Sequence, residues 1–409
     1  MQQKLFFERK NVQKYDLYRS LKNIIFYVNL VFFKVVGLVP WKTDVHKIFN
    51  NKIHNYHIYP FEVSKFGAIY NVVLIIIMFT YMSIGVILGQ LDQDYIDSII
   101  VKTIDKTLKL YGTILMLIVW LIYILQQKKI VDILNKLYQI NNSLKSCKKY
   151  KFQNNYCIYI ISFGNIIMCF SILLLEYLID SVLTFLLWAA PFIVASSVLV
   201  QYALLINIII QIFKSINATI LKLGNINTGN KIKTVFFRKV LLEESIINDI
   251  DIINYYNLKL CELCSEISDF YALPTLLIAI YFITSSTYNL HFLIMSLITS
   301  SEEFLLAVYL LCSVWFLAIM IDFAVLTTSV TRITREFVKT SHCIFLLSKE
   351  CTLDLNTRSA LTEFLNSLLH QNLEFTTHGV INLDGSLLQN ILGTIVTYLI
   401  ILIQFRPRE

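Results

Sequence analysis

The sequence predicts an all-α integral membrane protein with seven transmembrane helices and a cytoplasmic helical stalk. Of its 409 residues, 56% are hydrophobic and only 15% are charged, whereas about a quarter of the residues of a soluble protein are charged. Apolar runs of about 20 residues, long enough to cross a bilayer as helices, recur along the chain. Transmembrane β-strands would alternate apolar and polar residues instead, so the sequence favours a helical bundle.

Seven apolar segments are long enough to be predicted as spans. They are residues 66–90, 108–125, 156–178, 184–213, 272–296, 304–327 and 385–405. An eighth apolar stretch, Ile24–Pro40, is shorter and carries Lys34 near its middle. A lysine at the centre of a span costs about 2.5–3.5 kcal/mol, so we expect this stretch to form an amphipathic helix that lies on the inner membrane surface.

Lysine and arginine are concentrated in every second connecting segment, which predicts the orientation. Of the 35 basic residues, 30 fall in residues 1–65, 126–155, 214–271 and 328–384. By the positive-inside rule these segments are cytoplasmic, so the N-terminus is inside and seven crossings place the C-terminus outside. This is the reverse of the orientation of a G-protein-coupled receptor.

This orientation divides the chain into four predicted parts. Residues 1–65 form a cytoplasmic N-terminal segment with the amphipathic helix, and residues 66–384 hold spans one to six with long cytoplasmic helical extensions. Residues 385–405 are the last span, and residues 406–409 are an extracellular tail. The expected location is the plasma membrane.

Two inner segments carry apolar seams with a 4-3-4-3 spacing, which is typical of a helix that packs along one face. The first seam is Ile246, Ile250, Ile253, Asn257, Leu260, Cys264 and Ile267, and the second is Leu361, Leu365, Leu368, Asn372 and Phe375. Each seam either packs within one subunit or forms a stalk at which subunits meet. The sequence leaves both interpretations open.

The end of the last span carries the most specific motif in the chain. The segment TYLIILIQF begins with Thr397 and Tyr398 and ends with Gln404 and Phe405. These four residues resemble the signature of the insect gustatory receptor family. We therefore treat them as the motif residues of the chain.

Two further segments extend this resemblance. The segment HGVINLDGSLLQNILGT, residues 378–394, resembles the family's lead-in to the last helix, with Gly379 and Asp384 in the matching places. The segment KVVGLVPWK, residues 34–42, resembles the family's Gly-Leu-x-Pro-aromatic element, with Trp41 where Phe is more usual. Because these segments lie near opposite ends, the resemblance extends over nearly the whole length of the chain, although only the C-terminal motif is specific.

The resemblance implies a ligand-gated, poorly selective cation channel that a small-molecule tastant opens. It further implies a homotetramer, or a heterotetramer with other gustatory receptor subunits, in which the last helices line a central pore and cytoplasmic helices form the main contact between subunits. Leu399 stands where sugar-sensing members tend to carry Glu, which favours a bitter-type or fructose-type receptor. A co-receptor subunit that needs a partner is the alternative within the family.

The last span can supply such a pore. Steps of three or four residues back from Gln404 lead to Ile400 or Ile401, then Thr397, then Gly393, a slim and weakly polar face. Apolar rings beside it would close the pore by dewetting, and we expect Leu402 to face lipid. The predicted gate residues are Thr397, Ile400, Ile401, Gln404 and Phe405. Alternatively, Gln404 merely reaches the membrane interface.

Aromatic and polar residues in the outer halves of the spans are candidates for ligand contacts, because small-molecule sites combine apolar faces with a few polar groups. The candidates are Glu176, Thr184, Trp188, Tyr288, Tyr309 and Trp315. Alternatively, each of these side chains lies in the aromatic belt at the membrane interface or packs within the bundle. Asp322, within span six, is an intramembrane acid, and such residues are costly and mark functional sites. It could instead face water on the inner side.

Other function classes lack their signals. The chain carries no DRY-like or NPxxY string, no internal repeat typical of secondary transporters, and no HExxH, GxSxG or GxxxxGK[ST] string. Cys261 and Cys264 form a CxxC pair without the second pair that a zinc site requires. We therefore expect no enzyme, metal, cofactor or nucleic-acid partner; besides the ligand and other subunits, membrane lipid is the expected partner.

Overall fold

The computed structural model describes residues 24–45, 47, 59–87, 99–147, 149–152, 157–179, 182–223, 245–299, 305–350 and 355–404. Two short strands, β1 (Lys42–Thr43) and β2 (Phe61–Glu62), pair antiparallel. The labelled helices are α3 (Lys65–Ile87), α4 (Ile99–Leu125), α5 (Gln127–Leu144), α6 (Cys157–Ile179), α7 (Val182–Leu223), α8 (Ser245–Thr299), α9 (Leu305–Glu350), α10 (Leu355–Leu369) and α11 (Ser386–Gln404). A further helix, Ile24–Val35, precedes β1. The predicted gate residue Phe405 and the predicted tail 406–409 lie outside these ranges.

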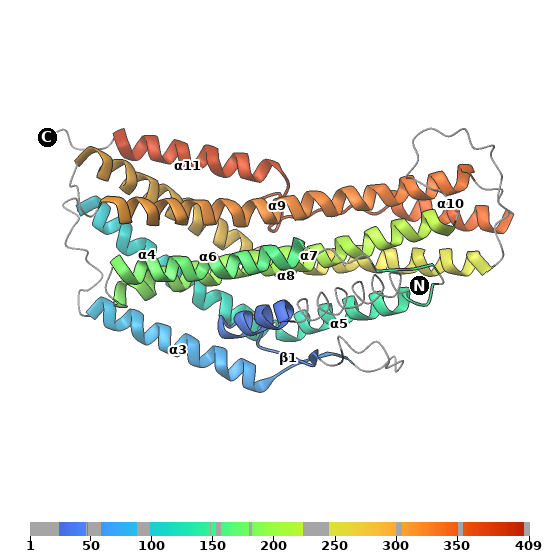
Figure 1. Ribbon diagram of the computed structural model, residues 1–409, viewed down its shortest axis with the longest axis horizontal. Coiled ribbons are helices and arrows are strands. Elements are labelled where there is room, and N and C mark those ends of the chain that lie inside the picture. The colour runs from blue at the N-terminus through green and yellow to red at the C-terminus, as the bar shows by residue number, and fades with distance from the viewer. Residues whose placement is uncertain are drawn as a thin grey trace, which may run out of the picture.

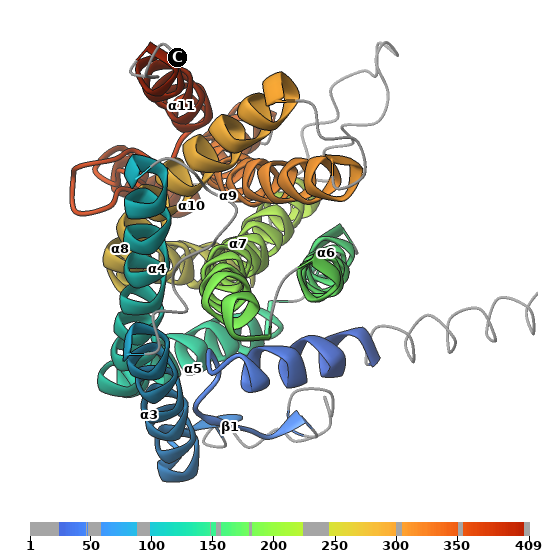
Figure 2. The same ribbon diagram turned by 90° about the vertical axis from the view of Figure 1, so that its left-hand side faces the viewer.

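Three helices run the length of the molecule (Figure 1). With 42, 55 and 46 residues, α7, α8 and α9 are about 63, 83 and 69 Å long, roughly twice the 30 Å of a hydrocarbon core. Figure 2 shows α7 at the centre of the bundle, and it packs on α4, α6, α8 and α9. We call one end the stalk: α5, α10 and the parts of α7, α8 and α9 at residues 214–223, 245–271 and 328–350.

Every predicted span coincides with a helix. Among the described residues, six helices have apolar windows long enough to cross a membrane, in α3, α4, α7, α8, α9 and α11. The seventh, α6, has 23 residues, about 34 Å, and is apolar over Ile160–Leu175. The helix Ile24–Val35 is about 18 Å long, too short to span, and lies across the bundle axis in Figure 2.

The predicted start of span two is wrong. Helix α4 begins at Ile99, nine residues before the predicted start at residue 108. Charged residues in the segment before residue 108 are typical of a loop. In the structure, however, Asp105 and Lys109 form an ion pair on one face of α4. A neutralised pair can be buried inside the bundle where a single charge could not.

The apolar seams pack within one subunit. Ile250, Ile253 and Leu260 of α8 are 2%, 0% and 0% exposed in the chain alone, so they cannot form a contact between subunits. Asn257, Cys264 and Ile267 are buried with them, and the side chain of Ile246 lies outside the described part. The second seam leaves its helix, because α10 ends at Leu369; Asn372 is exposed, Leu365 half-buried, and Leu361, Leu368 and Phe375 are buried. Of the two interpretations of the seams, this burial supports packing within one subunit, and for the buried residues it rules out a contact between subunits.

The segment Val35–Pro40, here called the collar, ties the start of the chain to the bundle. The backbone carbonyls of Val35, Val36, Gly37, Leu38 and Pro40 each accept a side-chain hydrogen bond, at 2.5–3.2 Å. The donors are Tyr70 and Asn71 of α3, Trp120 of α4, Gln127 of α5 and Gln201 of α7. An unpaired carbonyl at membrane depth would be unfavourable, so these side chains allow irregular backbone to enter the core.

Two glycines let the collar fit. Gly37 has a φ of +86°, a conformation that side chains disfavour. At Gly67 of α3, a Cβ atom would lie only 1.8 Å from the Pro40 carbonyl oxygen. The first turn of α3 therefore touches the collar backbone directly.

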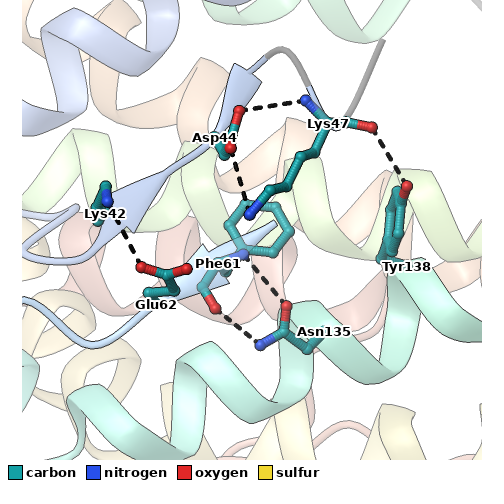
Figure 3. Close-up of polar contacts among 7 residues, drawn as sticks. All are labelled: Lys42, Asp44, Lys47, Phe61, Glu62, Asn135 and Tyr138. Atoms are coloured by element: carbon teal, nitrogen blue, oxygen red, sulfur yellow. Dashed lines mark hydrogen bonds and ion pairs between the residues drawn. The ribbon is translucent and has the colours of Figure 1, made fainter. Parts of the chain in front are cut away.

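The two-stranded ribbon is fixed on α5 (Figure 3). The Asn135 side-chain amide accepts a hydrogen bond from the Phe61 N–H at 3.3 Å and donates one to the Phe61 carbonyl at 3.0 Å. The Tyr138 hydroxyl donates to the Lys47 carbonyl at 3.3 Å. These contacts attach the N-terminal part of the chain to the start of the stalk.

Candidate functional site: aromatic cluster and last helix

Three predicted ligand residues meet in one aromatic cluster between α7, α8 and α9. The ring of Trp188 stacks on Tyr288 with centroids 5.8 Å apart and meets Trp315 edge-to-face at 6.2 Å. Phe192, one turn after Trp188, packs on Trp315 at 4.3 Å and on Phe282 at 5.5 Å. All five side chains are buried. The cluster offers the flat apolar faces that small-molecule sites use.

A buried ion pair on α4 borders this cluster. Lys109 Nζ lies 2.6 Å from Asp105 Oδ2, and the two side chains are 0% and 2% exposed. The Tyr288 hydroxyl donates to Asp105 Oδ1 at 3.3 Å, and Lys109 Nζ lies 6.0 Å from the centre of the Trp188 ring. The pair therefore provides charged and hydrogen-bonding groups beside the aromatic faces.

The other predicted ligand residues are Tyr309, Glu176 and Thr184. The side chain of Tyr309, on α9, is half-buried, and its buried hydroxyl has no hydrogen-bond partner among the residues that the structure describes. Glu176 lies on α6 and Thr184 on α7, but their side chains lie outside the described part of the structure. Among the candidates whose side chains the structure describes, Trp188, Tyr288 and Trp315 are brought together.

Asp322 faces the inside of the bundle and not open water. Its side chain is 2% exposed, and within the described part of the structure its Oδ2 has no hydrogen-bond partner. Ser196 of α7 lies beside the Asp322 carboxyl and donates a hydrogen bond to Asn165 Oδ1 of α6 at 2.8 Å. Asp322 of α9 thus belongs to a small buried polar cluster with residues of α6 and α7.

The last helix packs on α8 and α9 by one face only. Leu387, Ile391 and Ile395, at four-residue spacing, are the buried residues of α11. At 3.6 residues per turn, Gly393, Thr397 and Gln404 point roughly 160–200° away from Ile395, and all are exposed. The predicted pore stripe therefore lies on the face that turns away from the subunit's own bundle.

Other residues near the end of α11 differ in how they are oriented relative to the packed face. Ile400, Ile401 and Tyr398 are 50%, 38% and 54% exposed. Leu402 is half-buried and lies about 20° from Ile395 around the helix, so it faces its own subunit. The expectation that Leu402 faces lipid was wrong, because the packed face includes positions 395, 399 and 402.

The lead-in to α11 is a tight hairpin whose key residues have clear structural roles. Thr376 and Asn382 form a β-bridge, and His378 and Gly379 adopt φ values of 51° and 74° at its tip. Asp384 then caps α11, since its Oδ1 accepts from the Ser386 N–H at 2.9 Å. The hydrogen bonds from Ser386 hold the pKa of Asp384 below its usual value. Gly379 and Asp384 thus fix where the last helix begins.

The comparisons with known proteins agree with this architecture. The family described as 7tm Chemosensory receptor matches residues 26–409. The chain belongs to this chemosensory receptor family. As a member of a family of membrane receptors, the chemosensory receptor is not an enzyme.

Curated relatives of this chemosensory receptor are gustatory receptors of Drosophila melanogaster. "Putative gustatory receptor 2a" is 51% identical over 49 residues, which cover 12% of this chain and 11% of that protein. "Putative gustatory receptor 28a" is 30% identical over 162 residues, which cover 37% of this chain and 34% of that protein. The matched segments thus span about a third or less of these relatives.

Solved structures share the fold. The olfactory receptor OR5 from Machilis hrabei, solved in complex with eugenol, superposes with a TM-score of 0.65 over 95% of this chain and 100% of that chain, at 14% identity. A second structure of OR5 gives a TM-score of 0.64 over 95% of this chain, at 15% identity. The chemosensory receptor therefore has the fold of an insect olfactory receptor.

Asp105, Lys109 and Phe192 contact the predicted ligand residues but were not among the candidates from the sequence. Asp105 lies before the predicted span two, residues 108–125, and Lys109 lies inside it. Their four-residue spacing and opposite charges were a usable signal, because such a pair lies on one helix face. Phe192 carried no signal, since an apolar residue in an apolar span is ordinary.

Proposed function

We propose that this receptor is a subunit of a tetrameric, poorly selective cation channel in the plasma membrane that a small-molecule tastant opens. Its ligand would bind at the aromatic cluster, and α11 would line the pore. The Leu at position 399 favours a bitter-type or fructose-type ligand, and the basic residues favour a cytoplasmic N-terminus.

The observation that carries this proposal is the exposed stripe on α11. An isolated subunit in lipid has no reason to turn Gly393, Thr397 and Gln404 outward, since small and polar groups gain little there. Around a symmetry axis, four such stripes would form a slim, weakly polar path, and Ile400 would narrow it. The stripe contains no acidic residue, so a poorly selective path is expected.

The packing also supports a route from ligand to pore. Tyr288 lies on α8 and Trp315 on α9, and these are the two helices on which α11 packs. A ligand opens the channel only if it binds the open arrangement more tightly than the closed one. A ligand that separates or tilts α8 and α9 would therefore act directly on α11.

Contacts between subunits in the stalk would use its exposed apolar side chains. Tyr255, Val338, Phe345 and Leu369 are 55%, 62%, 55% and 81% exposed in the single chain. Large exposed apolar residues on a stalk outside the bilayer mark an interaction surface. We propose that these residues replace the buried seams as the sites of assembly.

Patch-clamp recording of cells that express this chain alone tests the proposal, with a panel of sugars and plant alkaloids. We expect a ligand-evoked cation current that Trp188→Ala abolishes at unchanged surface expression. Phe163→Ala, at a 44% exposed position of α6, is the control and should keep the current. A current that appears only with a second family subunit would indicate the co-receptor alternative. Ligand responses that require a G protein would contradict the channel.

A further inference from the structure

At the start of α5, three segments that are distant in sequence meet, and each of them carries a lysine close to the contact. The Gln127 amide donates to the Pro40 carbonyl at 2.5 Å and to the Ser64 carbonyl at 3.2 Å. Lys128 follows Gln127, and Lys65 follows Ser64, so both lie next to this point. Lys42 follows Pro40 by two residues and also lies close.

The lysines of this region are exposed and mostly without an acidic partner. Lys34, Lys65, Lys128 and Lys129 are exposed, and within the described part of the chain none of them has an ion pair. Lys42 lies 3.6 Å from Glu62, and both are well exposed. The nearby acidic residues are Glu62 and Asp132 of α5, and both are exposed. Because the lysines outnumber these two acids, the region carries an excess of positive charge.

Exposed apolar side chains adjoin the lysines. Phe66, next to Lys65, is 86% exposed, and Val35 and Val63 are 63% and 54% exposed. The helix Ile24–Val35 continues this surface, since Ile24, Tyr27, Val28 and Val31 are exposed along one side while Asn29 and Phe33 pack inward. The Tyr70 hydroxyl bonds the Val35 carbonyl at 2.8 Å, which holds this helix end, and Lys34 with it, against α3.

The depth of these residues corresponds to a membrane boundary. The apolar window of α3 begins at Lys65, and that of α4 ends at Leu125, two residues before Gln127. Lysines at this level lie where lipid phosphates lie, and the exposed apolar residues beside them lie where acyl chains begin. A free anion would gain nothing from contact with these apolar side chains, whereas a lipid would contact them through its acyl chain.

We propose that Lys65 and Lys128, with Lys34, Lys42 and Lys129 nearby, bind the headgroup of an acidic phospholipid, whose acyl chain lies along Val35 and Phe66. The lipid would bridge α3, the α4–α5 junction and the collar. The assignment to the inner leaflet rests on the proposed orientation, but binding itself does not depend on orientation or on channel activity. A failure of this site and a failure of the channel proposal are therefore distinguishable.

Native mass spectrometry of the purified full-length receptor tests the site, with dioleoyl phosphatidylserine and dioleoyl phosphatidylcholine as probes. The test variant is Lys65→Gln/Lys128→Gln/Lys129→Gln. Its control is Lys136→Gln/Lys145→Gln/Lys259→Gln, which removes the same charge from positions away from the Gln127 contact. Each lysine near an anionic surface contributes about fivefold in affinity, so we expect the preference for phosphatidylserine to fall at least roughly tenfold in the test variant only.

A charge-preserving variant, Lys65→Arg/Lys128→Arg/Lys129→Arg, should keep the preference and shows that a loss does not arise from misfolding. An equal loss of the preference for phosphatidylserine in the test variant and its control would mean a general charge effect and would overturn the site. An unchanged preference in the test variant, or equal displacement of phosphatidylserine and phosphatidylcholine by inorganic phosphate, would overturn it as well.

Discussion

Removing one partner of the Asp105–Lys109 pair should destabilise the receptor strongly, and removing both should not. The two side chains are 2% and 0% exposed and 2.6 Å apart, so neither charge has water to replace its partner. Breaking a buried pair from one side costs about 3–5 kcal/mol. We expect this loss for Asp105→Leu and for Lys109→Met, out of a total stability typically of about 5–15 kcal/mol.

The double variant should lose much less. It removes both charges but leaves the Tyr288 hydroxyl without its acceptor, which costs about 1–3 kcal/mol. The two single losses sum to about 6–10 kcal/mol, so the coupling energy should be about 3 kcal/mol or more.

Denaturation of the purified receptor in detergent, followed by tryptophan fluorescence, measures these differences. The control is the Lys136–Glu266 pair between α5 and α8, whose side chains are 51% and 36% exposed. Exposed pairs contribute about 0–1 kcal/mol, so its cycle should show little coupling. Additive losses at Asp105 and Lys109 would refute the argument from burial.

Three further predictions test the collar, the cap of α11 and the stalk. Gly67→Ala should prevent surface expression, because its Cβ would lie 1.8 Å from a collar carbonyl oxygen, whereas Gly164→Ala, with no neighbour within 4 Å, should be tolerated. Asp384→Ala should lose about 1 kcal/mol of stability in the same denaturation assay and Asp384→Asn almost none, since Asn caps equally well. Because the pKa of Asp384 is lowered by Ser386, its contribution is full above the usual aspartate pKa and falls only in more acidic solution, so a difference between about pH 6 and 8 would contradict the cap. Val338→Asp with Phe345→Asp should give monomers in mass photometry without loss of folding, and persistent tetramers would exclude this surface.

The apolar length of the segments was enough to predict the apolar helices α3, α4, α6, α7, α8, α9 and α11. A helix that crosses the bilayer needs about 20 apolar residues, so runs of this length are interpreted as spans and not as elements of a soluble protein. The stripe on α11 was also predictable, since Gly393, Thr397 and Gln404 share a face by helical geometry alone. The cluster of Trp188, Tyr288 and Trp315 was found because these were the large polar aromatics of the outer halves.

What could not be predicted depends on neighbours far apart in sequence. The 4-3-4-3 spacing identifies a packed face but not the partner, and for Ile253 the partner is the subunit itself. The collar carries no pattern of its own, because its stability comes from donors such as Trp120 and Gln201 on distant helices. The start of α4 was misplaced because charges were counted singly and not as a pair.

The most direct test of the central claim is the accessibility of cysteines on α11. Thr397→Cys and Gln404→Cys should react with a charged thiol reagent applied outside, and the reaction should block the ligand-evoked current. Ile403→Cys is the matched control, because its position is 40% exposed but turned about 100° from Gln404. The six cysteines whose side chains the structure describes are buried, which keeps background reaction from them low. Block at positions 397 and 404 with none at 403 supports a pore along this face, and block at 403 with none at 397 and 404 would contradict it.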